Sequence, residues 1–230
     1  MKDYKTLLFD LDDTLLDFGH AEHTALKKVL EYYGIKSIPQ HFNMYKKINR
    51  KHWELLEQDL ISKEDVLKLR HERFFSTIGF EVDGHEVDNL YRRNITEYGT
   101  RLFDGVLDLL HSLSDHHNLY IITNGVKETQ EARLLKSGLR PYFLNVFISE
   151  DTGYQKPMKA FFDHVAMNIP GFRHDEALIV GDSLTSDIKG GINSGIDTCW
   201  FNPDNHTNPH SYAPDYIVSR LDELTGILNY

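Results

Sequence analysis

Short apolar runs alternate with longer amphipathic segments along most of the 230-residue chain. Runs this short, without alternating polar positions, are typical of strands buried on both faces of a parallel sheet. We therefore predict strands over residues 7–9, 119–122, 146–148, 177–180, 198–201 and 216–218. The segments between them repeat apolar residues at helical spacing. The pattern predicts an α/β fold, with a Rossmann-like parallel sheet and helices on both of its faces.

One connection between strands is much longer than the others. Residues 17–102 separate the first strand from the next core-like segment, whereas a connection between a strand and a helix normally takes a few residues. We interpret this stretch as an inserted α-helical cap domain. The core would then consist of residues 1–16 and 103–230.

Four helices are expected inside the insertion, and residues typical of helix ends mark them. The first ends at Gly34 and the second follows Pro39. The third opens with Ser62 and Asp65, a pair similar to a capping box, and the fourth opens near Asp83.

Composition sets the broad class of protein. With 40% hydrophobic and 26% charged residues, the chain is an ordinary globular protein. A single cysteine excludes an internal disulfide and suits a reducing compartment. No apolar stretch approaches membrane-spanning length, and the net charge of −10 argues against nonspecific nucleic-acid binding. We expect a cytoplasmic protein without a membrane or nucleic-acid partner, and the oligomeric state stays open.

Carboxylates follow the first strand directly. Asp10 and Asp12 are two residues apart, so their side chains leave the same face of an extended backbone. In open parallel sheets, ligands bind beyond the carboxyl ends of the strands. Two carboxylates so close repel each other unless a cation or a shared proton intervenes, and Mg²⁺ would satisfy that need. The competing interpretation is that Asp12 or Asp13 caps a following helix.

Two further strand ends carry groups suited to an anion. Thr123, Asn124 and Gly125 follow the second strand and precede a helix, whose first backbone N–H groups form a natural phosphate cradle. Lys156 precedes Pro157, which we expect to be the first residue of the next helix. Lys156 would then lie at the positive end of a helix macrodipole, which is unfavourable by ~0.3–1 kcal/mol. A functional lysine and a solvated one both fit this pattern.

The fourth strand ends in a second acidic pair, Asp182 and Asp187. The helix after it contains Gly190 and Gly191, which each cost ~0.5–1 kcal/mol relative to alanine. Close packing of the backbone against a neighbour would explain them. Gly195 is a plausible end of that helix.

Together, these strand ends resemble the haloacid dehalogenase (HAD) superfamily. Its four motifs are matched, in chain order, by residues 10–14, Thr123, Lys156, and Asp182 with Asp187. The resemblance covers the whole chain, because the superfamily places a helical cap between its first two motifs.

The resemblance implies a phosphoric monoester hydrolase that forms an aspartyl-phosphate. Asp10 would be the nucleophile, and Asp12 would protonate the leaving oxygen and then take a proton from water. Thr123 and Lys156 would contact the phosphoryl oxygens as catalytic and phosphate-binding residues. Asn124 and Gly125 would complete the phosphate site.

The resemblance also implies Mg²⁺ as the cofactor. Asp10, Asp182 and the backbone carbonyl of Asp12 would ligate the ion. Asp187 would hold either a metal-bound water or Lys156.

Residues 122–125, 155–157, 190–195 and 198–202 look like the branch of small cytoplasmic 5′-nucleotidases that act on pyrimidine nucleoside monophosphates. The partner would be a small phosphorylated metabolite, a nucleotide, with the cap contacting its base. Phe18, Tyr45 and Trp53 are candidates for stacking on the pyrimidine ring. The alternative is that Tyr45 and Trp53 belong to the cap's own core.

Other functions stay open. A sugar phosphate, an acylneuraminate 9-phosphate or phosphoglycolate could be the substrate of the same four motifs. A dehalogenase would share Asp10 but would have no use for a proton donor at Asp12. A receiver-type signalling module also combines acidic residues, threonine, lysine and a phosphorylatable aspartate, but it lacks the helical insertion.

Overall fold

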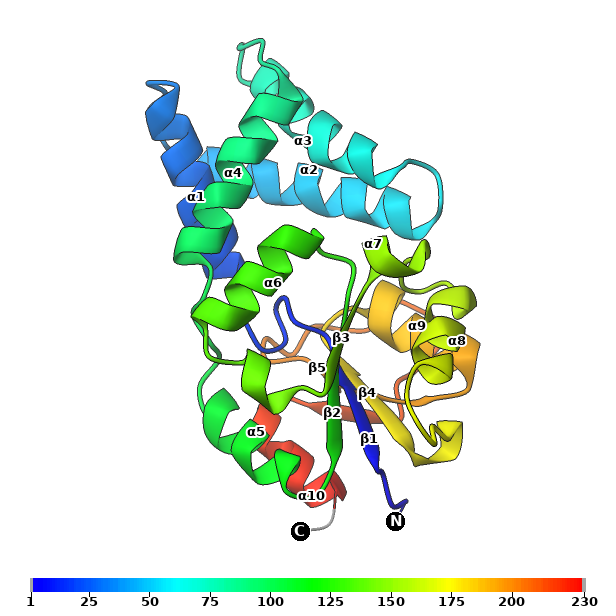
Figure 1. Ribbon diagram of the computed structural model, residues 1–230. Coiled ribbons are helices and arrows are strands. Elements are labelled where there is room, and N and C mark those ends of the chain that lie inside the picture. Colours follow the sequence, from blue (N-terminus) through cyan, green and yellow to red (C-terminus); the bar gives the residue numbers. More distant parts are fainter. Residues whose placement is uncertain (1, 229–230) are drawn as a thin grey trace. The chain divides into compact units, whose positions relative to one another are not determined.

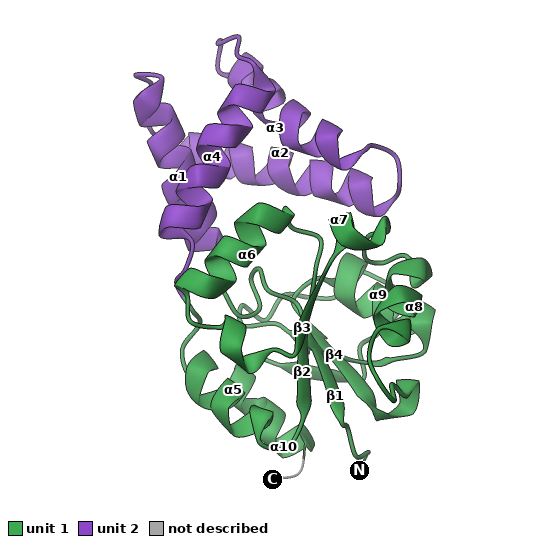
Figure 2. Ribbon diagram, in the orientation of Figure 1, with its two compact units in different colours: residues 1–17, 102–230 green, residues 18–101 purple. Residues whose placement is uncertain are grey.

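The computed structural model describes residues 2–228, which form two compact units (Figure 2). One unit combines Met1–Asp17 with Leu102–Tyr230 and contains the sheet. The other, Phe18–Arg101, is made of helices. In the described part of the chain, no helix has the length and apolar character that crossing a bilayer requires.

The first unit is built on the six-stranded parallel sheet that the sequence predicted. The strands are β1 (Thr6–Phe9), β2 (Asn118–Thr123), β3 (Asn145–Ile148), β4 (Ala177–Gly181), β5 (Asp197–Phe201) and β6 (Tyr216–Val218). Their order is β3-β2-β1-β4-β5-β6, and every neighbouring pair is parallel. Phe9, the last residue of β1, is paired with Ile121 of β2 and Val180 of β4. The carboxyl ends of β1, β2 and β4 therefore meet at one edge.

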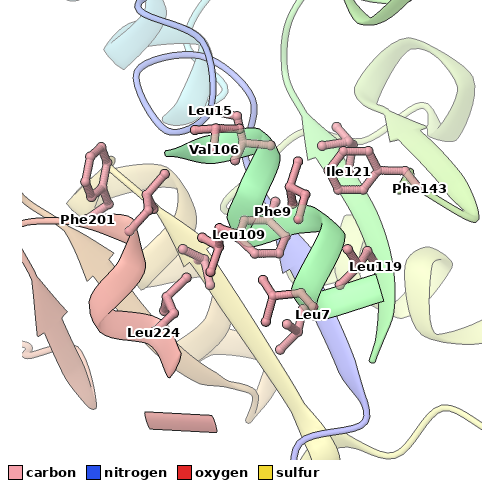
Figure 3. Close-up of a cluster of buried hydrophobic side chains, with 14 of the residues drawn as sticks. Leu7, Phe9, Leu15, Val106, Leu109, Leu119, Ile121, Phe143, Phe201 and Leu224 are labelled. Carbon is pink, nitrogen blue, oxygen red and sulfur yellow. The ribbon is translucent and has the colours of Figure 1, made fainter. Parts of the chain in front are cut away.

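Helices cover both faces of this sheet (Figure 1). The helices of the unit are α5 (Val106–Ser114), α6 (Lys127–Lys136), α7 (Ser149–Thr152), α8 (Lys159–Met167), α9 (Lys189–Ser194) and α10 (Leu224–Leu228). Shorter turns are the 3₁₀ segments Arg140–Tyr142, His174–Glu176 and Leu221–Glu223 and the π-helical turn Leu184–Ile188. Leu7 and Phe9 of β1 pack in a cluster with residues of α5 and α10 (Figure 3). Leu8 faces the other way, toward Phe161 and Phe162 of α8. Both faces are covered, which explains why β1 is apolar without alternation.

The glycine pair of α9 marks a close contact, as predicted. A Cβ on Gly190 would lie 2.3 Å from the ring of Phe162, and one on Gly191 would lie 2.2 Å from Cγ2 of Thr198. Side chains at these positions would push α9 away from α8 and β5. Gly195 ends the helix with φ +69°, a conformation that favours glycine.

The second unit consists of α1 (Phe18–Tyr32), α2 (Pro39–Glu57), α3 (Lys63–Thr77) and α4 (Gly84–Tyr98). The capping box is confirmed: Ser62 Oγ accepts from the backbone N–H of Asp65, and Asp65 accepts from that of Ser62. Asp83 accepts from the first N–H groups of α4.

A buried polar network lies inside the helical unit. Arg70 donates to Asn49 Oδ1 (2.9 Å) and to Asp88 Oδ1 (2.5 Å), and Arg92 donates to Asp88 Oδ2 (2.6 Å). His71 Nε2 lies 3.3 Å from Asp88 Oδ1. Burial lowers the pKa of His71 to about 4, although the contact with Asp88 favours the protonated ring. His71 is therefore a neutral member of this network near pH 7.

Candidate active site

The chain turns back immediately after the first carboxylates. The backbone N–H of Asp10 donates to the carbonyl of Val180 (2.9 Å), which continues the pairing of β1 with β4. Asp13 adopts φ +53°, and its N–H donates to the carbonyl of Leu16 (2.8 Å). Asp10 thereby stays at the carboxyl edge of the sheet. The interpretation of Asp12 or Asp13 as a helix cap is wrong, because α1 begins at Phe18.

Lys156 is the centre of a buried ion cluster. Its side chain is 2% exposed, and Nζ donates to Asp10 Oδ1 and Asp187 Oδ1, both at 2.6 Å. Nζ also donates to the carbonyl of Ile122 at 3.0 Å. The three contacts join β1, β2 and the turn after β4 through one ammonium group.

The prediction that Lys156 lies at a helix start was wrong. Pro157 is not the first residue of a helix: Met158 closes a turn onto the carbonyl of Gln155 (2.8 Å), and α8 begins at Lys159. Lys156 is buried and not solvated. Carboxylates hold it, so its environment favours the charge.

Three carboxylates converge beside Lys156. Oxygens of Asp10, Asp182 and Asp187 lie within 4.8 Å of one another. The carboxylate of Asp187 accepts a hydrogen bond from the backbone N–H of Ser183 (3.1 Å). It also lies close to Gly181, because a Cβ on Gly181 would be 2.3 Å from the carboxyl carbon of Asp187. The glycine that ends β4 thus makes room for this carboxylate.

The cluster carries excess negative charge. Burial raises the pKa of Asp10 to about 8 despite Lys156, and burial with the neighbouring carboxylates raises the pKa of Asp182 well above its usual range. Burial opposes the charge of Lys156, but Asp10 and Asp187 outweigh it and raise its pKa. Within residues 2–228, Asp182 has no lysine or arginine partner. Oxygen ligands with uncompensated charge fit a hard divalent cation such as Mg²⁺.

The end of β2 arranges the second motif. Thr123 Oγ1 accepts from the backbone N–H of Gly125 (3.1 Å) and from Gln130 Nε2 (3.0 Å), so the hydroxyl hydrogen is left to donate to a ligand. Asn124 makes a contact that the sequence did not predict. Its side-chain amide donates to the carbonyl of Lys156 (2.9 Å) and accepts from the Lys156 N–H (2.9 Å), which fixes the lysine's backbone.

Comparison with known proteins identifies the family. The sequence profile of haloacid dehalogenase-like hydrolases matches residues 7–201. The chain belongs to this family. It is 45% identical to the HAD-hydrolase YfnB of Bacillus subtilis, over 100% of this chain and 97% of YfnB. A crystal structure of YfnB bound to magnesium superposes with a TM-score of 0.95, at 44% identity and full coverage of both chains.

Two further relatives are named for an activity. The pyrimidine 5′-nucleotidase PynA of Streptococcus pneumoniae is 42% identical over 98% of this chain and 95% of PynA. The pyrimidine 5′-nucleotidase YjjG of Escherichia coli is 33% identical over 96% of each chain. This HAD hydrolase is accordingly a phosphoric monoester hydrolase.

Two residues of the HAD core were missed from the sequence. Gln130 and Arg133, both on α6, bind the carboxylate of Asp12: Gln130 Nε2 donates to Oδ2 (2.7 Å) and Arg133 Nη1 to Oδ1 (2.5 Å). Arg133 is fully buried. Their spacing in the sequence indicates that they are buried, because it places them on the same face of α6 as the apolar Leu134.

The aromatic candidates of the helical unit lie in different surroundings. Tyr45 is fully buried, and its ring centroid lies 5.4 Å from that of Phe74. The prediction that Tyr45 stacks on a substrate is therefore wrong, because the core of the unit already covers its ring. Phe18 and Trp53 are half-buried, and the guanidinium of Arg70 lies 6.0 Å from the Trp53 ring.

Proposed function

We propose that this HAD phosphatase hydrolyses nucleoside 5′-monophosphates, with pyrimidine bases preferred, through an aspartyl-phosphate on Asp10. The main support for this chemistry is the buried cluster of Asp10, Asp182 and Asp187 around Lys156. The near full-length similarity to PynA and YjjG supports the substrate class.

The reaction divides into two displacements at phosphorus. In the first, an oxygen of Asp10 forms a bond to phosphorus, the ester bond breaks, and Asp12 protonates the departing alcohol. In the second, Asp12 takes a proton from water, the water oxygen bonds to phosphorus, and the bond to Asp10 breaks. Inorganic phosphate is released, and Asp10 returns to its starting form.

Two groups of the core stabilise charge on the transferring phosphoryl group. Lys156 brings a positive charge. The hydroxyl of Thr123 can donate its hydrogen to a phosphoryl oxygen, because Oγ1 only accepts in its contacts with Gly125 and Gln130. Asn124 supports Lys156, since its side chain fixes the backbone of the lysine. Gly125 would be part of the phosphate site, and its lack of a side chain makes room for the amide of Gln130.

The carboxylate cluster suits Mg²⁺. Asp10, Asp182 and the backbone carbonyl of Asp12 would hold the ion, and Asp187 would act through Lys156, to which it is already bonded. When bound, Mg²⁺ would offset the negative charge that carboxylates and phosphoryl oxygens bring together.

Steady-state kinetics on dUMP, dTMP, UMP, AMP, phosphoglycolate, an acylneuraminate 9-phosphate and several sugar phosphates would test this function. We expect a pyrimidine nucleotide to give the highest kcat/KM. Asp10→Asn should abolish turnover, and Asp12→Asn should lower kcat on the order of 10²–10⁴-fold. Phe18→Ala tests the base contact: a higher KM for nucleotides, with KM for p-nitrophenyl phosphate unchanged, would support it.

Two results would contradict the proposal at different levels. A tenfold higher kcat/KM for a sugar phosphate or phosphoglycolate would overturn the nucleotidase assignment and leave the phosphatase mechanism standing. Near-native turnover by Asp10→Asn would remove Asp10 as the nucleophile and with it the mechanism.

A further inference from the structure

Helix α6 holds the carboxylate of Asp12 with two side chains one turn apart. Gln130 Nε2 donates to Asp12 Oδ2 at 2.7 Å, and Arg133 Nη1 donates to Asp12 Oδ1 at 2.5 Å. Arg133 Nη1 also donates to Gln130 Oε1 at 2.9 Å, so the two residues orient each other. Because both oxygens of Asp12 are bound, neither torsion of its side chain is left to rotate.

This arrangement is built into the core of the fold. Arg133 is fully buried and Gln130 is 1% exposed, whereas the side chain of Asp12 is 28% exposed. Gly125 accommodates Gln130, because a Cβ there would lie 2.3 Å from Gln130 Nε2. The two donors on α6 are therefore buried in the core, whereas the carboxylate that they bind lies on a partly exposed loop.

The same contacts reach the phosphate site. Gln130 Nε2 also donates to Thr123 Oγ1 at 3.0 Å. A single amide thus touches the proposed proton donor and the proposed phosphate-binding hydroxyl. A purely structural ion pair has no need to join these two groups.

We infer that Gln130 and Arg133 are positioning residues that place the Asp12 carboxyl, relative to Thr123, for proton transfer to and from the substrate oxygens. The inference rests on the proposed function, in which Asp12 is the acid and base. Without these contacts Asp12 samples several rotamers and misses the leaving oxygen in most of them.

The leaving group gives a specific test. An alkoxide leaving group depends on a proton donor, whereas p-nitrophenolate leaves with little help. Arg133→Gln should therefore lower kcat for the best natural monophosphate about tenfold or more, with KM little changed, and lower kcat for p-nitrophenyl phosphate much less. Arg133→Lys should restore part of the loss. Lys136→Gln, a change of an exposed residue on the same helix, is the matched control.

A double variant tests whether Arg133 acts through Asp12. If Arg133 acts through Asp12, the double variant Asp12→Asn/Arg133→Gln should be no slower than Asp12→Asn alone. Gln130→Leu, which keeps the buried volume, provides an independent variant with the same expected leaving-group pattern if Arg133→Gln does not fold. Circular dichroism establishes which variants are folded.

The outcomes separate this inference from the function on which it rests. Equal losses for both leaving groups, or additive losses in the double variant, would overturn the positioning role. A faster Arg133→Gln enzyme would also overturn it, since the contact would then restrain Asp12 in an unproductive position. If Asp12→Asn itself shows no leaving-group selectivity, the proposed mechanism fails instead.

Discussion

Replacing Lys156 with alanine tests whether the ion cluster supports the fold as well as the chemistry. The side chain is 2% exposed, and its ammonium is the shared partner of Asp10 and Asp187. A lysine in water at a helix end would contribute nothing measurable to stability. The structure gives the opposite expectation, because Lys156→Ala leaves two buried carboxylates and the Ile122 carbonyl without this donor.

The size of the loss can be worked out from these contacts. Removing one partner of a buried ion pair costs ~3–5 kcal/mol, because the remaining charge is buried without compensation. Proton uptake favours the lower end of this range, since burial already raises the pKa of Asp10 to about 8. For a domain of this size, 1 kcal/mol shifts Tm by about 2–4 °C, so we expect Tm to fall by roughly 6–20 °C.

Thermal unfolding followed by circular dichroism, in a buffer with chelator, would measure this change. Lys159→Ala is the matched control: Lys159 is 60% exposed and pairs with Asp163 one turn along α8. An exposed pair of this kind contributes about 0–1 kcal/mol, so the control should unfold close to the wild type. Turnover should be lost in Lys156→Ala and kept in Lys159→Ala.

Equal Tm values for the two variants would mean that the Lys156 ion cluster does not stabilise the fold. In that case the carboxylates would have found another partner or a proton at little cost, and the role of Lys156 would be confined to the phosphoryl group.

Three other predictions rest on particular contacts. Exhaustive chelation should abolish turnover and Mg²⁺ should restore it; undiminished activity without metal would exclude the cluster as a catalytic metal site. The unfolded chain protonates His71 near pH 6.5, whereas burial in the folded chain lowers the pKa of His71 to about 4. The free energy of unfolding, measured with urea, should therefore fall by about 2 kcal/mol between about pH 7 and about pH 5. This fall should be absent in His71→Gln. An unchanged slope in that variant would point to other groups. Gly191→Ala should lower the free energy of unfolding by ~1–3 kcal/mol, because the new Cβ overlaps with Thr198. Gly226→Ala is the control and should leave Tm nearly unchanged, because nothing lies within 4 Å of its new Cβ. Similar Tm values for the two variants would mean that α9 shifts freely.

The pattern of residues along the chain was enough to predict the helices and strands and the edge of the sheet that carries the site. Residues 7–9 are apolar on both faces, and Ser62 can cap only the helix that begins directly after it. Burial and capping could therefore be inferred from neighbours in the chain. Parallel strands place their carboxyl ends together, and this rule alone predicts that Asp10 and Asp182 lie at one edge of the sheet.

The partners of each side chain, in contrast, depend on how the chain folds. Lys156 was misjudged because the macrodipole argument assumes water around the lysine, and the folded chain replaces that water with carboxylates from residues 146 and 31 positions away. The contact of Asp12 with Arg133 spans 121 residues, and the helical spacing that places Arg133 on the same face as Leu134 does not show which distant group the arginine meets. Charge and burial at a site depend on which distant elements pack around it, and that depends on the whole fold.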